Sequence, residues 1–214
     1  MYLNMNKEDG LLHVNPFHGT LDEEGMIQII RDTVLREGPH KFVYSNIGMS
    51  ILGYIAGKVE GEGFWDGLTR YIREDLCLEH TFLGNIDLPG YDKKDNECRC
   101  WQWNKDDIIA PAGALNAAVR DLLDFADRNI DGSLPYLSLC HEVHGSIDEN
   151  TDNGLAWRLD RKQTISWHTG SAGAFSCWLG LNRETKTAVA VGINYGLVKA
   201  EQIGFSILRN EDKL

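Results

Sequence analysis

The chain has 214 residues and a formal net charge of −11 at pH 7, with 43% hydrophobic and 25% charged residues. This composition is typical of a globular protein, and the acidic balance argues against nonspecific binding to nucleic acid or to an anionic membrane. No apolar run reaches the roughly 18 residues of a membrane span, and Met1 to Asp9 contain no apolar signal region. We therefore expect no nucleic-acid partner, no membrane partner and, by default, a cytoplasmic location.

The five cysteines cannot form a fully paired disulfide framework, because their number is odd. Cys98 and Cys100 could surround a metal ion together with His141 and His144, but their spacing fits no usual zinc pattern. We therefore expect two ordinary thiols at these positions, no metal and no cofactor. The remaining cysteines lie in apolar or mixed sequence and are predicted to be small core residues: Cys77, Cys140 and Cys177.

Helical signals dominate the first two thirds of the chain, where apolar residues recur every three or four positions. Helices are predicted from Thr20, where Thr20 and Glu23 form a capping box, to Gly38-Pro39; over about 46–59; over about 64–76; and from Asn116, as N-cap, to about Ile130. The polar segment between Pro89 and Asp107 is predicted to be a long irregular excursion.

After about Asn150 the pattern changes to short strand-like segments with hairpin-length connections. Strands are predicted over 156–160, 163–168, 174–181 and 187–194, followed by a helix over about 198–208. Helices first and an antiparallel meander second indicate an α+β fold rather than alternating βαβ units. We expect a single domain over residues 1–214, with a helical lobe over about 20–150. Residues 151–214 should form an antiparallel sheet of three or four strands, covered by the C-terminal helix.

Two short constellations stand out as candidate chemistry. The first is Tyr44-Ser45-Asn46, just before a predicted helix, and the second is His168-Thr169-Gly170 followed by Ser171-Ala172-Gly173, between two predicted strands. Each has a structural alternative. Ser45 or Asn46 could simply be a helix N-cap, and Gly170 with Gly173 could simply form a hairpin corner.

Taken in chain order with their surroundings, these stretches resemble the serine β-lactamase and penicillin-binding protein superfamily. The resemblance is to its class C-like branch, which also holds esterases and D-amino-acid peptidases. The matching stretches are 42–48 and 52–55, 75–81, 111–115 with 121–125, 167–175 and 194–196. The resemblance implies a β-lactamase/transpeptidase-like fold and an acyl-enzyme mechanism on the amide or ester bond of a small acyl substrate.

The resemblance also implies a role for each residue of the two motifs. Tyr44 would pass a proton to the leaving group, and Asn46 would hold the substrate amide or a catalytic lysine. His168 would supply positive charge or a hydrogen bond, while the backbone N–H of Ser171 would form half of an oxyanion hole. The substrate would lie along the same strand, at Thr169, Gly170 and Gly173, where the glycines allow close approach.

One family element has no counterpart here. The superfamily's nucleophile is the serine of a Ser-x-x-Lys helix turn, and none of the nine serines in this chain is followed three residues later by lysine. Only 43 residues precede Tyr44, so we expect the N-terminal helix, the first strands and the nucleophile helix to be missing. The chain would then be a fragment, a split-gene product or an inactive relative.

We accordingly expect a β-lactamase-like serine hydrolase that is inactive as this chain alone. The alternatives are a catalytically dead module that binds a D-peptide or β-lactam-like ligand, and a vestigial structural fragment. Missing strands would leave an unpaired sheet edge, and such an edge invites another chain. We therefore expect a homodimer, or association with the missing N-terminal segment.

Overall fold

The structure is a computed structural model that describes residues 15–17, 19, 21–38, 40–162, 164–196 and 198–209. Its helices are α1 (Glu23–Asp32), α2 (Asn46–Glu60), α3 (Phe64–Glu74), α4 (Val119–Asp131) and α5 (Ala200–Leu208), with 3₁₀ segments η2 (Ala110–Ala112) and η3 (Pro135–His141). All five predicted helices are confirmed, although α1 ends well before Gly38. No described helix has both the length and the apolar character that a bilayer crossing requires.

The N-terminal caps differ from the predictions at two helices. Asp22, whose carboxylate accepts a hydrogen bond from the Gly25 N–H at 2.8 Å, caps α1, and Thr20 lies outside the described residues. Asn116 does not cap α4, which follows Ala118 without a side-chain cap. Its amide instead donates to the Gly84 carbonyl at 2.7 Å, so a distant contact replaces the local role.

Within the described residues, the strands form one large sheet and two small ones. The large sheet has six strands in the order β10-β9-β8-β7-β6-β5, and every pair is antiparallel. Its strands are β5 (Gly145–Ser146), β6 (Thr151–Asn153), β7 (Arg158–Asp160), β8 (Ile165–Ala172), β9 (Phe175–Asn182) and β10 (Thr187–Ile193). The antiparallel meander is confirmed, but β5 and β6 extend it to six strands and start it before Asn150.

Two small pairs of strands lie beside the large sheet, one joining distant segments and one a hairpin. β1 (Thr81–Leu83) pairs with β4 (Leu115–Ala117), and β2 (Pro89–Tyr91) pairs with β3 (Glu97–Arg99). The second pair falls inside the segment predicted to be irregular, so that prediction was wrong for its first half. The backbone N–H of Tyr91 donates to Asn194 at 2.8 Å, which ties this hairpin to the end of β10.

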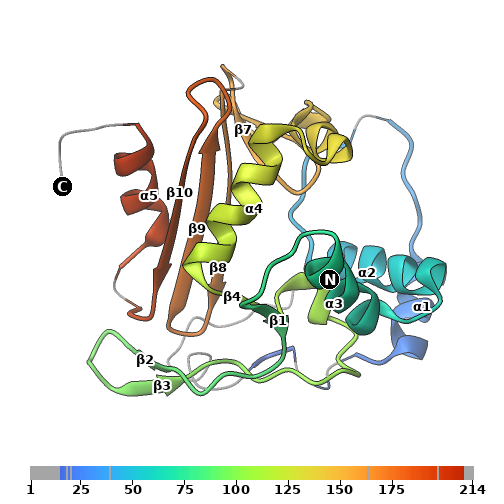
Figure 1. Cartoon of the computed structure of the whole chain (residues 1–214). Coiled ribbons are helices and arrows are strands. Elements are labelled where there is room, and N and C mark those ends of the chain that lie inside the picture. Colours follow the sequence, from blue (N-terminus) through green and yellow to red (C-terminus); the bar gives the residue numbers. More distant parts are fainter. Residues whose placement is uncertain are drawn as a thin grey trace.

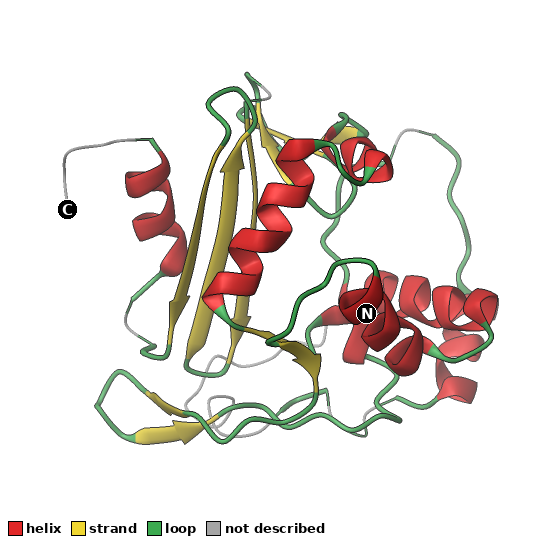
Figure 2. Ribbon diagram, in the orientation of Figure 1, coloured by secondary structure: helices red, strands yellow, loops and turns green. Residues whose placement is uncertain are grey.

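Helices cover both faces of the large sheet, with α5 on one face and α4 on the other (Figures 1 and 2). Because side chains alternate along a strand, β9 sends Trp178 toward α5 and Leu179 and Leu181 toward α4. Trp178 is fully buried, and a Cβ at Gly204 of α5 would lie 2.1 Å from its ring. Glycine at this position lets α5 lie directly on the indole.

The helical lobe packs through one face of α2. A Cβ at Gly53 would lie 2.4 Å from Cγ of Pro111, and one at Gly57 would lie 2.3 Å from the Phe64 nitrogen. These two glycines, with the buried Ser50, therefore let α2 approach η2 and the start of α3 closely. This packing fixes the start of α2, where the first sequence motif lies.

Candidate active site

The first motif lies where the chain enters α2. Ser45 is the N-cap, and its hydroxyl accepts a hydrogen bond from the Gly48 N–H at 3.0 Å. The structural alternative weighed for Ser45 is thus what the structure shows. Asn46 is the first residue of the helix, and Tyr44 precedes the cap with 53% of its surface exposed. An aromatic ring so exposed is free to meet a ligand or another chain.

The second motif lies on β8 and faces the first. The Tyr44 and His168 rings are 6.3 Å apart between centroids and stack with an interplanar angle of 29°. This separation is within the ~10 Å expected for groups that act on one small substrate. Because His168 pairs with Leu179 of β9, it lies on the sheet face covered by α4. The fold therefore brings together the two rings that the sequence motifs singled out.

The surroundings of His168 favour its neutral form. Burial lowers the pKa of the imidazole below its usual value of 6.5, and the positive charge of Arg158 lowers it further, against a smaller opposing effect of a backbone hydrogen bond at Thr169. A neutral imidazole has one donor and one acceptor nitrogen. His168 can thus exchange a hydrogen bond with a phenol or a substrate, whereas a permanent positive charge at this position is disfavoured.

The other residues of the second motif do not all share the face of His168. Thr169 pairs with Trp178, which packs toward α5, and so its side chain lies on the opposite face. Ser171, two residues further along β8, has its side chain on the same face as Thr169 and is exposed. Only the backbone groups of these two residues can therefore serve the same site as the His168 side chain.

The local structure explains why glycine occupies both positions of the motif. Gly170 pairs with Cys177, and a Cβ there would lie 2.6 Å from the Cys177 sulfur. Gly173 forms the turn between β8 and β9 with φ +60°, a conformation that favours glycine. The hairpin-corner alternative therefore describes Gly173, while Gly170 leaves room for a neighbouring thiol.

Cys177 is a residue of this region that the sequence reasoning missed. It was predicted to be in the core, and so was Cys77, but both are exposed. The register places Cys177 on the same sheet face as His168, two residue pairs along, and strand alternation was the signal that could have found it. Although the residue reaches the surface, its sulfur lies against Gly170, and partial removal from water there raises the pKa of the thiol, against a smaller opposing effect of a backbone hydrogen bond at Gly170. The thiolate needed for nucleophilic attack is thus disfavoured.

The cysteine and histidine residues considered as a metal site in the sequence analysis do not form one in the described structure. His141 is buried and engaged on both ring nitrogens, 2.9 Å from Oγ of Ser166 and 3.0 Å from Oδ1 of Asn129. Across the residues that the structure describes, no group of three or more His, Cys, Asp or Glu side chains is arranged to hold a metal ion.

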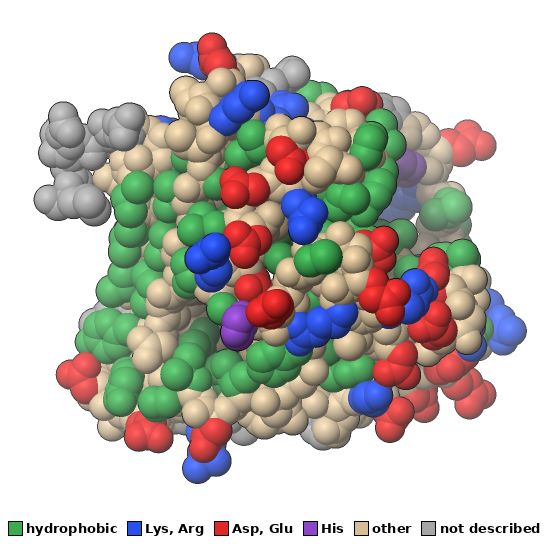
Figure 3. Space-filling view, viewed as in Figure 1, with side chains coloured by type: hydrophobic (Ala, Val, Ile, Leu, Met, Phe, Trp, Pro, Cys, Tyr) green, Lys and Arg blue, Asp and Glu red, His purple; other side chains and the backbone are tan. Residues whose placement is uncertain are grey.

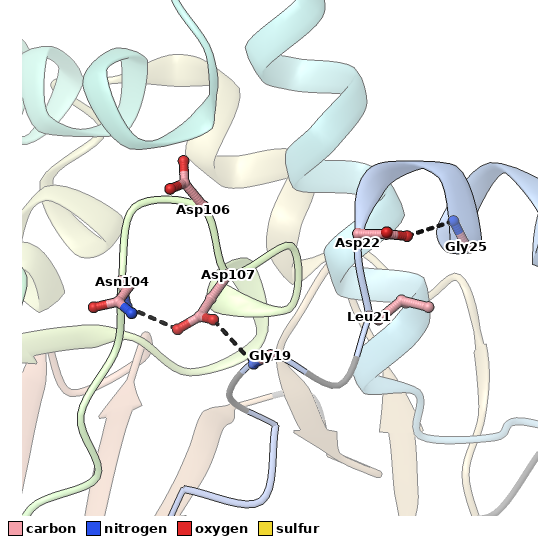
Figure 4. A pocket seen from close by; sticks show the side chains of 7 residues that line it. All are labelled: Gly19, Leu21, Asp22, Gly25, Asn104, Asp106 and Asp107. Carbon is pink, nitrogen blue, oxygen red and sulfur yellow. Dashed lines mark hydrogen bonds between the residues drawn. The ribbon is translucent and has the colours of Figure 1, made fainter.

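A cavity of about 510 Å³ lies elsewhere, between the start of α1 and the loop that precedes η2 (Figure 4). It is lined by Gly19, Leu21, Asp22, Gly25, Asn104, Asp106 and Asp107. Asp22 caps α1, and the Asp107 carboxylate accepts hydrogen bonds from the backbone of Gly19 and Asn104. None of the predicted site residues lines this cavity, and two of its carboxylates already hold backbone groups.

Comparison with known proteins places this geometry in context. A family model described as Beta-lactamase matches residues 10–201. A class C beta-lactamase superposes with a TM-score of 0.76 at 16% identity, over 95% of this chain and 67% of its own. The class C beta lactamase from Rhodobacter sphaeroides superposes with a TM-score of 0.73 at 19% identity, over 96% of this chain and 70% of its own. The octameric penicillin-binding protein homologue from Pyrococcus abyssi superposes with a TM-score of 0.72 at 20% identity, over 88% of this chain and 47% of its own.

At these identities the solved structures establish the fold alone. They confirm the predicted α+β architecture of the β-lactamase and transpeptidase type. The chain spans about half to two thirds of the length of these structures. The comparison with curated proteins finds no match.

Proposed function

Since the chain belongs to the beta-lactamase family, we propose that it forms one side of an acyl-transfer site for amide or ester bonds of a small acyl or D-peptide-like substrate. In this proposal Tyr44, Asn46 and His168 serve proton transfer and substrate positioning, and the serine nucleophile comes from outside this sequence. The observation that carries the proposal is the stacking of Tyr44 on His168 at 6.3 Å.

The chemistry requires a proton to move twice. A serine hydroxyl attacks the substrate carbonyl and loses its proton, and the C–N or C–O bond then breaks as the leaving group gains one. Tyr44 is suited to relay that proton because its hydroxyl both donates and accepts. Neutral His168 supports the relay as a hydrogen-bond partner, and Asn46, at the start of the same helix, would orient the substrate amide.

The remaining motif residues would bind rather than react. The backbone N–H of Ser171 would donate to the developing oxyanion, together with the N–H of the absent nucleophile. Thr169, Gly170 and Gly173 would line the path of the substrate along β8 through their backbone. Water would then hydrolyse the acyl-serine ester, with the proton returning through Tyr44 to the serine.

Without the nucleophile the chain should not turn over. Its nine serines include none in the Ser-x-x-Lys pattern, and the raised pKa of Cys177 disfavours a substitute thiolate. The test is intact-mass spectrometry after incubation with a labelled penicillin and with a fluorophosphonate, with a complete class C β-lactamase as the positive control. We expect no covalent adduct on this chain. A stoichiometric adduct would contradict the proposal and identify the attacking residue.

The same serine pattern favours a second candidate, a binding module that holds a D-peptide or β-lactam without reaction. Calorimetry with an acylated D-alanyl-D-alanine peptide separates the two. Saturable binding that Tyr44→Ala abolishes, with no adduct in the mass spectrum, would favour the binding module.

A further inference from the structure

A buried hydrogen-bond network is anchored on the strand that carries His168. Ser166 lies two residues before His168 on β8, so strand alternation places both side chains on the face covered by α4. Ser166 is fully buried, and its hydroxyl lies 2.9 Å from Nδ1 of His141. The other ring nitrogen, Nε2, lies 3.0 Å from Oδ1 of Asn129. The network thus joins β8 to η3 and to α4.

Asn129 sets the direction of each hydrogen bond. Acidic and basic side chains cover the outer face of α4 (Figure 3), and Asn129 is one of the buried residues of this helix. Its amide nitrogen donates to the Phe125 carbonyl at 2.8 Å, so its Oδ1 is left to accept from Nε2 of His141. A neutral imidazole has one donor and one acceptor nitrogen. Nδ1 therefore accepts from the Ser166 hydroxyl.

The surroundings of His141 keep this arrangement in place at neutral pH. Burial lowers the pKa of His141 from 6.5 to about 4, helped by the positive charge of Arg183. The ring is therefore neutral at pH 7, and each of its nitrogens keeps a single role as donor or acceptor.

His141 also packs against the residue directly before β7. Its ring lies 5.1 Å from the Trp157 ring, at an interplanar angle of 41°. The β7–β8 register pairs Arg158 with Trp167. Continued by one residue, the same register places Trp157 opposite His168. His141 is therefore in contact with two neighbours of His168, one along β8 and one across from it.

The burial of Ser166 assigns the network a positional role and not a catalytic one. Because this serine is fully buried, its hydroxyl is out of reach of a substrate. The first three residues of β8 are buried, and the five that follow, beginning with His168, are partly or fully exposed. Ser166 thus anchors the strand directly before it enters the candidate active site.

We propose that His141 is a positioning residue for the candidate active site and that it acts through Ser166. Their hydrogen bond holds the buried part of β8, and the strand then presents His168 to the stacked ring of Tyr44. Groups that act on a substrate must be held within about 0.5 Å of their working geometry, which supporting hydrogen bonds achieve. The inference rests on the proposed function, which gives the placement of His168 its purpose.

The test uses a matched pair of substitutions at His141. In asparagine Oδ1 is bonded to Cγ, as Nδ1 is in histidine, so His141→Asn can still accept from the Ser166 hydroxyl. The glutamine amide lies one bond further out, near the position of Nε2, so His141→Gln keeps only the contact with Asn129. Each variant loses one hydrogen bond of the network. Neither changes the charge at pH 7, because His141 is neutral there.

Nuclear Overhauser effects between the ring protons of Tyr44 and His168 at pH 7 measure the outcome, with circular dichroism to confirm folding. We expect an equally strong cross-peak in the unmodified chain and in His141→Asn, and its loss in His141→Gln. A general loss of stability would weaken the cross-peak in both variants alike. Equal cross-peaks in the two variants overturn the proposal, and so does the absence of a cross-peak in the unmodified chain.

This readout is separate from the test of the proposed function, because it needs no substrate. A covalent adduct in the mass spectrum would refute the proposed function and leave the result at His141 as it stands. Equal cross-peaks in the two His141 variants, with no adduct, would refute the positioning role alone.

A second pair keeps the proposal testable if His141→Gln does not fold. Ser166 and Ser50 are both fully buried, but the Ser50 hydroxyl donates to the Asn46 carbonyl of its own helix at 2.8 Å. We expect Ser166→Ala to weaken the cross-peak and Ser50→Ala to leave it unchanged. Cross-peaks of equal strength in these two variants would refute a role for the contact between His141 and Ser166.

Discussion

Acidification should destabilise the protein through His141. This imidazole is 3% exposed, lies 5.1 Å from the Trp157 ring, and is hydrogen-bonded to Ser166 and Asn129. Burial, helped by the charge of Arg183, lowers the pKa of His141 from 6.5 to about 4. The fold therefore holds the neutral form, in which Nε2 donates to Oδ1 of Asn129, and a second proton on Nδ1 would displace the hydrogen bond that this nitrogen accepts from the Ser166 hydroxyl.

The sign and size of the effect follow from linkage. Between pH 6.5 and 4 the unfolded chain binds a proton that the folded chain excludes, so this contribution to stability is complete above pH 6.5 and is lost as the pH falls toward 4. A shift of this size corresponds to at most about 3 kcal/mol, of which about 2 kcal/mol is lost by pH 4.5. Such a loss is a large part of a typical stability of about 5–15 kcal/mol.

Urea unfolding at pH 7 and pH 4.5 measures this contribution when the chain is compared with His141→Gln. Titrating carboxylates act on both proteins alike, so the difference between them isolates the imidazole. We expect His141→Gln to be less stable at pH 7 by about 1–3 kcal/mol, because buried partners lose hydrogen bonds. The difference in the free energy of unfolding between the two proteins should be smaller by about 2 kcal/mol at pH 4.5. Parallel losses in the two proteins would refute the reasoning.

Three further predictions concern packing and accessibility. Gly204→Ala should lower the free energy of unfolding by about 1–3 kcal/mol, because the added methyl group would overpack on Trp178. Gly145→Ala is the control, since a Cβ at Gly145 has no heavy atom within 4 Å and should not lower this free energy. Equal melting temperatures of the two variants would contradict the prediction. Asp121→Ala should lower the free energy of unfolding by about 2 kcal/mol, because the His80 N–H and the Thr81 hydroxyl lose their acceptor. Asp124 is half-exposed and contacts only the exposed Arg120 among the ion pairs of its helix, so Asp124→Ala should change this free energy by less than about 0.5 kcal/mol in urea. A thiol reagent with mass readout should label the exposed Cys177 in the native state and spare the buried Cys98. The Cys177 rate should rise with pH, because the thiolate is the reacting form, and the rise should lie at higher pH than for a free thiol because the pKa of Cys177 is raised. Rapid labelling of Cys98 would count against the packing described.

Local signals predicted the helices well. The start of α2 could be found because Ser45 is followed by apolar residues at helical spacing, and its cap needs only the Gly48 N–H. The prediction of Asn116 as an N-cap was wrong, because its side chain instead donates a hydrogen bond to the carbonyl of Gly84, which is distant in sequence and gives no local signal. The strands β5 and β6 were missed because segments of two and three mostly polar residues have no readable period.

The candidate site could be predicted only in part. Resemblance to a family singled out Tyr44 and His168, and the fold places their rings together. Strand alternation then separates side chains that are neighbours in sequence, and Cys177 joins the face of His168 only through the β8–β9 register. The network of His141, Ser166 and Asn129 had no signal at all, because its members come from three separate elements.

The central claim is that Tyr44 and His168 form one site in which the imidazole is neutral. NMR titration of the His168 ring signals, in the unmodified chain and in Tyr44→Leu, tests it most directly. We expect His168 to titrate below 6.5, and its ring proton shifts to move when the stacked phenol is removed. Titration at or above 6.5, with shifts that Tyr44→Leu leaves unchanged, would contradict the account.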